Sequence, residues 1–153
     1  MILSRTCCII VLLPIAALSV EAGTKAPRFV QADVYFMSWE TMTRSAQRPA
    51  EVRSHPDVVV RGVEGECLKG LIGALRLDEL KPSRKGGGDA RLVIDFRDAS
   101  GKLVTYYADS FRLMSEDASS SRQIDEGFKY LVGSSLFRGK EAWCTPLTRP
   151  ADI

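Results

Sequence analysis

Residues 90–110 carry the clearest alternation of apolar and polar side chains, on either side of a short polar turn. Asp98 and Gly101 fit a hairpin turn closed by a glycine at positive φ, a conformation that only glycine adopts without a steric penalty. This turn pairs Asp98 with Lys102 and thereby sets the register of two antiparallel strands. Six further cross-strand pairs follow: Arg97 with Leu103, Phe96 with Val104, Asp95 with Thr105, Ile94 with Tyr106, Val93 with Tyr107 and Leu92 with Ala108.

The predicted register divides the hairpin into two faces, because successive side chains of a strand point to opposite sides. One face is apolar and is predicted to be core: Leu92, Ile94, Phe96, Val104, Tyr106 and Ala108. The other face is mixed: Val93, Asp95, Arg97, Leu103, Thr105 and Tyr107. A one-residue slip would mix the two sets, so the hydrophobic pattern supports the register. The mixed face is either solvated, covered by a helix, or a binding face.

Two further strands are predicted before the hairpin, at residues 29–39 and 57–63, from their β-branched and aromatic residues. The first is apolar on both faces apart from Asp33, which is typical of a strand covered on both sides. Its alternation would place Tyr35, Met37 and Trp39 on one face. Residues 111–114 either extend the hairpin or start another strand, and residues 115–122 are predicted to be an exposed polar loop.

Apolar residues spaced three and four apart predict helices at residues 64–77 and 124–137. Gly70 and Gly73 weaken the first helix, and glycines on one helix side often allow close approach to a sheet. Pro49 suits the first position of one short helical turn at 49–54, which His55 and Pro56 end.

The element order is therefore strand, short helix, strand, helix, two strands, helix and tail. It predicts an α+β fold in which two helices pack on a mainly antiparallel sheet of about four strands. We expect one domain over residues 23–153, with no internal repeat.

The first 22 residues are predicted to be a signal peptide. Arg5 supplies a positive start, residues 7–18 are apolar, and Ala22 is a small residue suited to cleavage. The apolar run is shorter than the roughly 20 residues that a membrane-spanning helix needs, although a retained anchor stays an alternative. Arg5 and Thr6 replace the small residues of a lipoprotein box before Cys7 and Cys8. We expect no membrane insertion after cleavage.

Cleavage would leave two cysteines, Cys67 and Cys144. In an oxidising compartment such a pair predicts a disulfide, which would tether the tail at 139–153 to the helix at 64–77. The alternative is two separate buried thiols.

Charge and composition narrow the choice of compartment and partner. A formal net charge of +2, scattered along the chain, gives no support for nucleic-acid binding. The chain has no asparagine, and its 14 arginines outnumber 7 lysines. Because asparagine and lysine have AT-rich codons, this composition favours a GC-rich genome and a bacterial periplasmic or secreted protein.

A search for catalytic and metal-binding patterns finds no motif, and we expect neither an enzyme nor a cofactor. The single histidine, His55, has no nucleophile or acid near it in sequence. Glu64 and Glu66 beside Cys67 are an acidic helix start and not part of a zinc set. Residues 86–88 lack the lysine of a phosphate-binding loop. The carboxylates that could still meet in space are Asp33, Glu40, Asp95 and Asp109.

The mixed hairpin face is the remaining candidate binding site. Aromatic residues and arginine dominate the energetics of protein–protein interfaces. The candidate binding residues are Asp95, Arg97, Thr105 and Tyr107 on the hairpin, with Tyr35 and Trp39 on the first strand. The loop residues Lys81, Arg84 and Lys85 could steer an acidic partner, or could simply be solvated.

We therefore expect an exported, non-enzymatic protein that binds another protein, such as an inhibitor or an immunity protein against a toxin or a cell-wall-acting enzyme. This expectation rests on general features of the chain, which is predicted to be a small exported single domain with one disulfide and no catalytic groups. No diagnostic motif supports it. The alternatives are an accessory subunit of an envelope assembly and a small hydrolase that uses paired carboxylates.

Overall fold

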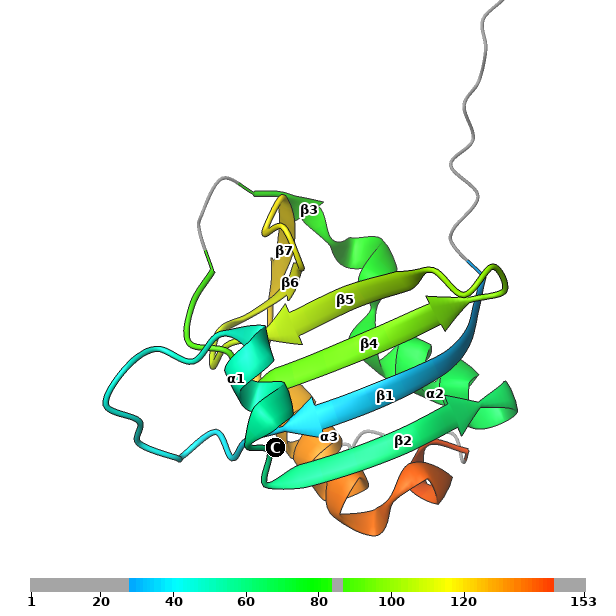
Figure 1. Cartoon of the computed structure of the whole chain (residues 1–153), viewed down its shortest axis with the longest axis horizontal. Coiled ribbons are helices and arrows are strands. Elements are labelled where there is room, and N and C mark those ends of the chain that lie inside the picture. The colour runs from blue at the N-terminus through cyan, green and yellow to red at the C-terminus, as the bar shows by residue number, and fades with distance from the viewer. Residues whose placement is uncertain (1–27, 84–86, 145–153) are drawn as a thin grey trace, which may run out of the picture.

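The computed structural model describes residues 28–83 and 87–144, which form one seven-stranded antiparallel sheet with helices on both faces (Figure 1). The strand order across the sheet is β2-β1-β4-β5-β6-β7-β3. The strands are β1 Phe29–Phe36, β2 Val58–Glu64, β3 Lys81–Pro82, β4 Leu92–Asp98, β5 Leu103–Ala108, β6 Arg112–Ser115 and β7 Ser120–Gln123. The helices are α1 Pro49–Ser54, α2 Gly65–Leu75 and α3 Glu126–Arg138, with 3-10 turns η1 Leu77–Glu79 and η2 Lys140–Trp143.

The α+β class agrees with the prediction, but the expected number of about four strands is wrong, since the sheet has seven. Strand β6 agrees with the second alternative for residues 111–114, a separate strand, but β7 forms where an exposed polar loop was expected, so β6 and β7 make a second hairpin. The two-residue strand β3 then pairs with β7 inside the predicted basic loop. All three strands are short, and β3 and β7 are polar, so they lack the β-branched and aromatic pattern that identified the other four.

The turn of the β6–β7 hairpin is built from polar side chains. The Ser115 hydroxyl donates to the Asp117 carboxylate at 2.7 Å, and the Ser119 backbone N–H donates to the same oxygen at 3.0 Å. These hydrogen bonds, chiefly that of Ser115, lower the pKa of Asp117 to about 2. The serine-rich segment is therefore a structured turn, in which side chains replace solvent as partners of the backbone.

The predicted hairpin register is confirmed for all six pairs from Arg97–Leu103 to Leu92–Ala108. The turn also forms as expected: the Gly101 N–H donates to the Asp98 carbonyl at 2.9 Å, and Gly101 has φ of 83°. Strand β1 pairs with β4 on the other side, so β4 is a central strand. The predicted core face lies under helices, with Leu92, Ile94, Phe96 and Ala108 each at most 1% exposed.

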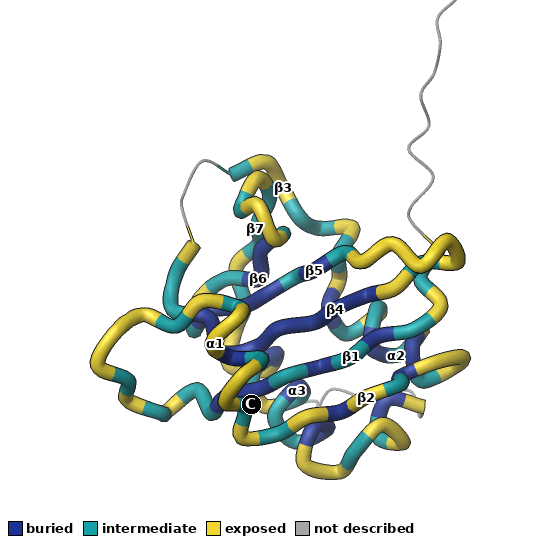
Figure 2. The backbone as a smooth tube through the Cα atoms, viewed as in Figure 1, coloured by how far each residue is buried: buried dark blue, intermediate teal, exposed yellow. Residues whose placement is uncertain are grey.

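Helices α2 and α3 cover one side of the sheet, which we call the back face (Figure 1). The main core lies between them and β1, β2, β4 and β5 (Figure 2). Each helix contributes three or four buried residues: Leu68, Leu71 and Leu75 from α2, and Phe128, Val132, Ser135 and Leu136 from α3. No helix among the described residues is long and apolar enough to cross a membrane.

On the opposite side, the front face, the six-residue α1 is the only helix within residues 28–83 and 87–144 (Figure 1). Val52 of α1 is fully buried in a second, smaller apolar cluster. The other buried members of this cluster are Met37, Ala90, Val93, Tyr107 and Met114. Both faces of β4 are therefore buried near α1, which explains why residues 92–96 are all buried.

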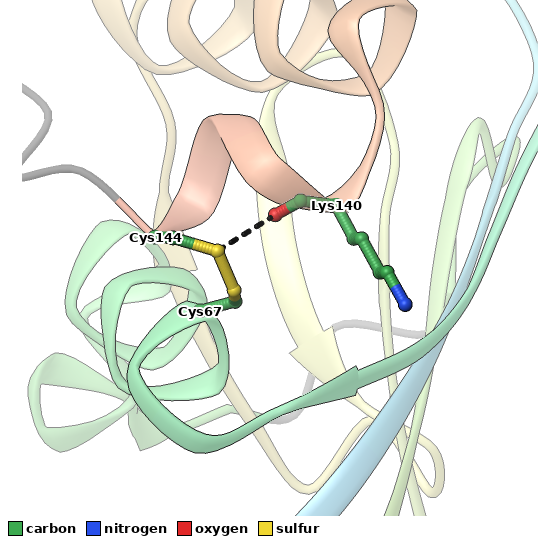
Figure 3. The surroundings of a disulfide bond; sticks show 3 residues. All are labelled: Cys67, Lys140 and Cys144. Atoms are coloured by element: carbon green, nitrogen blue, oxygen red, sulfur yellow. Dashed lines mark hydrogen bonds between the residues drawn. A yellow bond between two sulfur atoms is a disulfide. The ribbon is translucent and has the colours of Figure 1, made fainter.

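Cys67 of α2 and Cys144, just after η2, form the predicted disulfide (Figure 3). The preceding residue, Trp143, is 1% exposed and belongs to the main core. The disulfide and this indole together hold the end of the described chain against α2. The predicted signal peptide and the tail beyond Cys144 lie outside the described residues, as do Arg84, Lys85 and Gly86.

Gly70 allows this contact. A Cβ atom at Gly70 would lie 2.0 Å from the Trp143 carbonyl oxygen, whereas one at Gly73 would have nothing within 4 Å. The predicted close approach of a glycine in this helix therefore occurs, but toward η2 and not toward the sheet.

Substituting the two glycines separately tests this contact. Gly70→Ala is expected to lower the free energy of unfolding by about 1–3 kcal/mol, because the methyl group forces η2 away from α2. The matched variant Gly73→Ala is expected to raise it by up to about 1 kcal/mol, because alanine is the better helix former. Urea unfolding of both variants measures the difference, and equal effects of the two substitutions would contradict the contact.

Removing the disulfide is expected to cost about 4 kcal/mol by the chain-entropy relation, because the linked residues are 77 positions apart. The variant Cys67→Ala plus Cys144→Ala, compared with the oxidised protein by denaturant unfolding, measures this cost. Free-thiol titration of denatured residues 23–153, without the predicted signal peptide and its two cysteines, should find no reactive thiol. Two reactive thiols would rule the disulfide out.

Candidate interaction face

Three rows of side chains cross the front face, each defined by the strand registers. The row nearest α1 contains Val59, Tyr35, Val93, Tyr107 and Met114. The middle row contains Asp33, Asp95 and Thr105. The outer row, toward the tip of the β4–β5 hairpin, contains Glu64, Gln31, Arg97 and Leu103. These rows differ sharply in how they are covered.

Arg53 of α1 covers the middle row and binds two of its three side chains, Asp95 and Thr105. Its Nε and Nη2 donate to the two carboxylate oxygens of Asp95 at 2.7 and 2.6 Å. The same Nη2 donates to Thr105 Oγ1 at 3.0 Å, and that hydroxyl donates to Asp95 Oδ1 at 2.7 Å. The hydrogen bonds with Asp95 raise the pKa of Arg53 against the opposing effect of burial, and the charge of Glu116 adds to the rise. The three side chains form a closed network that joins α1 to β4 and β5.

Asp33 lies directly opposite Asp95 on the neighbouring strand. Two facing carboxylates repel each other, so each needs its own partner. Arg53 neutralises Asp95, while Asp33 Oδ1 accepts the Gly62 backbone N–H at 2.9 Å. The structure thus brings together two of the carboxylates considered for hydrolysis, but Arg53 occupies both oxygens of one of them.

The other two acids lie apart from this pair. Asp109 Oδ1 accepts the backbone N–H groups of Phe111 and Arg112 at 2.7 and 2.6 Å, in the turn between β5 and β6. Glu40 is exposed in the loop that leads to α1, and His55 is exposed at the C-terminal end of that helix. Among the described residues, no three His, Cys, Asp or Glu side chains are grouped as metal ligands.

A buried arginine positions the chain that enters α1. Arg91 pairs with Asp89 and donates to Thr43 Oγ1 at 3.3 Å. The Gln47 backbone N–H donates to the Asp89 carboxylate at 2.5 Å, and the Ala90 N–H donates to the Gln47 carbonyl at 2.8 Å. The segment before α1 is thereby tied to the start of β4, and this placement lets Arg53 reach Asp95.

Tyr107 is part of the core and not of the surface, since it is only 5% exposed. A Cβ at Gly87 would lie 2.4 Å from the Tyr107 hydroxyl oxygen, and a Cβ at Gly88 would lie 2.1 Å from Asp109 Oδ2. Burial raises the pKa of Tyr107, and the nearby charge of Asp109 raises it further. A side chain at Gly87 or Gly88 would have to displace Tyr107 or Asp109, because the backbone lies directly on these two side chains.

The six candidate binding residues therefore separate into groups. Asp95 and Thr105 share the Arg53 network, Tyr107 is covered, and Tyr35 is half-buried beside the α1 cluster. Arg97 is exposed and has no ion-pair partner among residues 28–83 and 87–144. Trp39 packs on the back-face core, where its ring lies 5.3 Å from that of Phe36. The expected nearness of Trp39 to the hairpin face is wrong, because β1 ends at Phe36 and the alternation stops there.

Arg53 is the residue of this face that the sequence analysis missed. Its contact with Asp95 spans 42 positions, and nothing in the short helix identifies it. The available signal was Asp95 itself: a carboxylate within the apolar run LVIDF requires a buried cation or hydrogen-bond donors. That requirement predicts that a partner exists but not which of the 14 arginines supplies it.

The outer row has no cover from any described helix (Figure 1). Arg97 is exposed, Leu103 is 49% exposed, and Gln31 lies between Arg97 and Glu64 in the register. We call Gln31, Arg97 and Leu103 the open face. It lies on the paired strands β1, β4 and β5, beside the network that fixes α1.

Comparison of the chain with protein-family models, curated proteins and solved structures found no match in any of the three. The functional argument therefore depends on the geometry of this face.

Breaking the network tests whether Arg53 holds α1 in place. Arg53→Ala is expected to lower the free energy of unfolding by about 2–3 kcal/mol, because it leaves Asp95 buried and facing Asp33. Adding Asp95→Asn should recover part of this loss, since it removes the uncompensated charge. Arg44→Ala, at an exposed loop arginine, is the matched control and should change stability by less than about 0.5 kcal/mol. Equal effects of the two arginine substitutions would refute the assignment.

Proposed function

We propose that this protein is exported and acts without catalysis, as an inhibitor or immunity protein that binds another protein through its open face. The observation that carries the proposal is the uneven cover of the sheet. Two helices bury the back face, whereas the front face leaves an exposed arginine and a half-exposed leucine on adjacent strands. Arginine beside apolar surface, held on a rigid sheet, has the character of an interface hot spot.

Export is supported by two features. The Cys67–Cys144 disulfide is of the kind that persists in oxidising compartments. The apolar segment at residues 7–18 has the composition of a signal peptide. Both are compatible with a periplasmic or secreted protein, whose partner would be a toxin or an envelope enzyme.

The role of an accessory subunit in an envelope assembly remains the alternative. It would use the same face, but the partner would be a structural protein and binding would inhibit no activity. Partner identification followed by an activity assay of that partner separates the two roles.

The test is partner recovery from a periplasmic extract, followed by affinity measurement with the identified protein. Arg97→Glu plus Leu103→Asp is expected to weaken binding by roughly 30-fold or more, as loss of a hot spot of about 2 kcal/mol implies. Tyr107 is unsuitable for this test because it is buried. Arg44→Glu is the matched control and should bind as the wild type does. Unchanged affinity of the double variant would show that the open face is not the binding surface.

A further inference from the structure

The two edges of the sheet differ in how well they are protected against pairing with another strand. An edge strand exposes unpaired backbone N–H and C=O groups, which proteins usually protect with short length, lysine or proline. One edge, β3, has all three protections, since it consists of Lys81 and Pro82 alone. The other edge, β2, is seven residues long and begins with three consecutive valines. No described strand pairs with its outer side.

The sequence at this edge is self-complementary in an antiparallel arrangement. Residues 57–61 read Asp-Val-Val-Val-Arg, with opposite charges at the two ends. Asp57, Val59 and Arg61 are all exposed, with Val59 at 39%. Arg61 has no ion-pair partner among the described residues, and Asp57 uses only Oδ2, which accepts the Ser38 N–H at 2.7 Å. Both charges are therefore available for a partner.

We propose that β2 pairs antiparallel with β2 of a second copy of this chain, about a two-fold axis at Val59. Val59 then faces its own copy, each Val58 faces Val60 of the other copy, and each Asp57 faces Arg61 of the other copy. Opposite charges directly across an antiparallel pair stabilise it, and like charges destabilise it. This register brings no like charges face to face, and it joins the two sheets into one continuous sheet with an isologous interface.

The segment of β2 that can pair with a second copy ends at Gly62. This residue has φ of 65°, and the β1–β2 register shifts at the same point, between Ala32 and Val34. A bulge at an edge bends the strand away and interrupts pairing. The pairing is therefore limited to residues 57–61, and the dimer is expected to be concentration-dependent and not obligate.

This inference is independent of the proposed function. The open face of Gln31, Arg97 and Leu103 lies on β1, β4 and β5, whereas the proposed dimer uses β2. The experiments can therefore contradict the dimer and support partner binding, or contradict partner binding and support the dimer.

The experiment uses the exported protein, purified with its disulfide intact, in sedimentation equilibrium over a wide concentration range. Wild type is expected to show a monomer–dimer equilibrium. Arg61→Asp and Asp57→Arg should each raise the dimer dissociation constant at least about tenfold, because each places like charges opposite one another. An equimolar mixture of the two variants should form heterodimers with near wild-type affinity, since the opposite charges then face again. Arg44→Asp, with the same charge change elsewhere, should dimerise normally.

A monomer at all concentrations, or dimers that persist unchanged in Arg61→Asp, would overturn the proposal. So would a mixture that stays monomeric while both variants keep the circular dichroism spectrum and melting temperature of the wild type.

A cross-link tests the position of the axis. Residues directly opposite in an antiparallel pair have Cα atoms about 4.5–5.5 Å apart, within the range of a disulfide. Val59→Cys is therefore expected to give a covalent dimer on non-reducing gels under mild oxidation. Leu103→Cys, which is also exposed but lies three strands away from the edge, should stay monomeric. Equal cross-linking of both variants would contradict the register.

Discussion

The charge of Asp95 is the constraint on which the front of the molecule depends. This carboxylate lies in the central strand β4, within a run that is otherwise buried, and directly opposite the carboxylate of Asp33. A buried anion beside another anion requires a cation with several donors, and the guanidinium of Arg53 meets both carboxylate oxygens and Thr105 at once. Because Arg53 is carried by α1, this requirement fixes where α1 lies. The place of α1 in turn determines which part of the sheet is buried and which part stays open.

The hairpin was predictable because local rules agreed with one another. Turn chemistry at Asp98 and Gly101 and the alternation of Leu92, Ile94 and Phe96 all support one register, and that register is present. The helices at 49–54 and 64–77, and the Cys67–Cys144 bridge, followed from equally local or compositional signals. These features depend on residues close in sequence, or on a cysteine pair with no competitor in the expected mature chain.

The errors arose where the decisive contact lies far away in sequence. Strand β7, Ser120–Gln123, is polar and becomes a strand only because β6 and β3 pair with it. Trp39 was placed by extending the alternation of β1 three residues beyond its end at Phe36. Tyr107 was a candidate binding residue on a face whose cover was left open, and the backbone of Gly87 that lies against it belongs to a segment with the composition of a loop. In these cases tertiary contacts, and not the local pattern of side chains, determined the structure.

The two faces of the sheet are stabilised by different means, and this difference bears on function. The back face has an extended apolar core, two helices and a disulfide that holds Trp143 in place, so the sheet itself is covered there. The front face relies on one buried valine of α1 and one charged network, which together cover only the half of the sheet nearest α1. Such a network positions α1 well but buries little apolar area, so the outer row stays accessible beside it. Val59 and Arg61 stay exposed at the β2 edge for the same reason, because neither α1 nor any described strand covers them there.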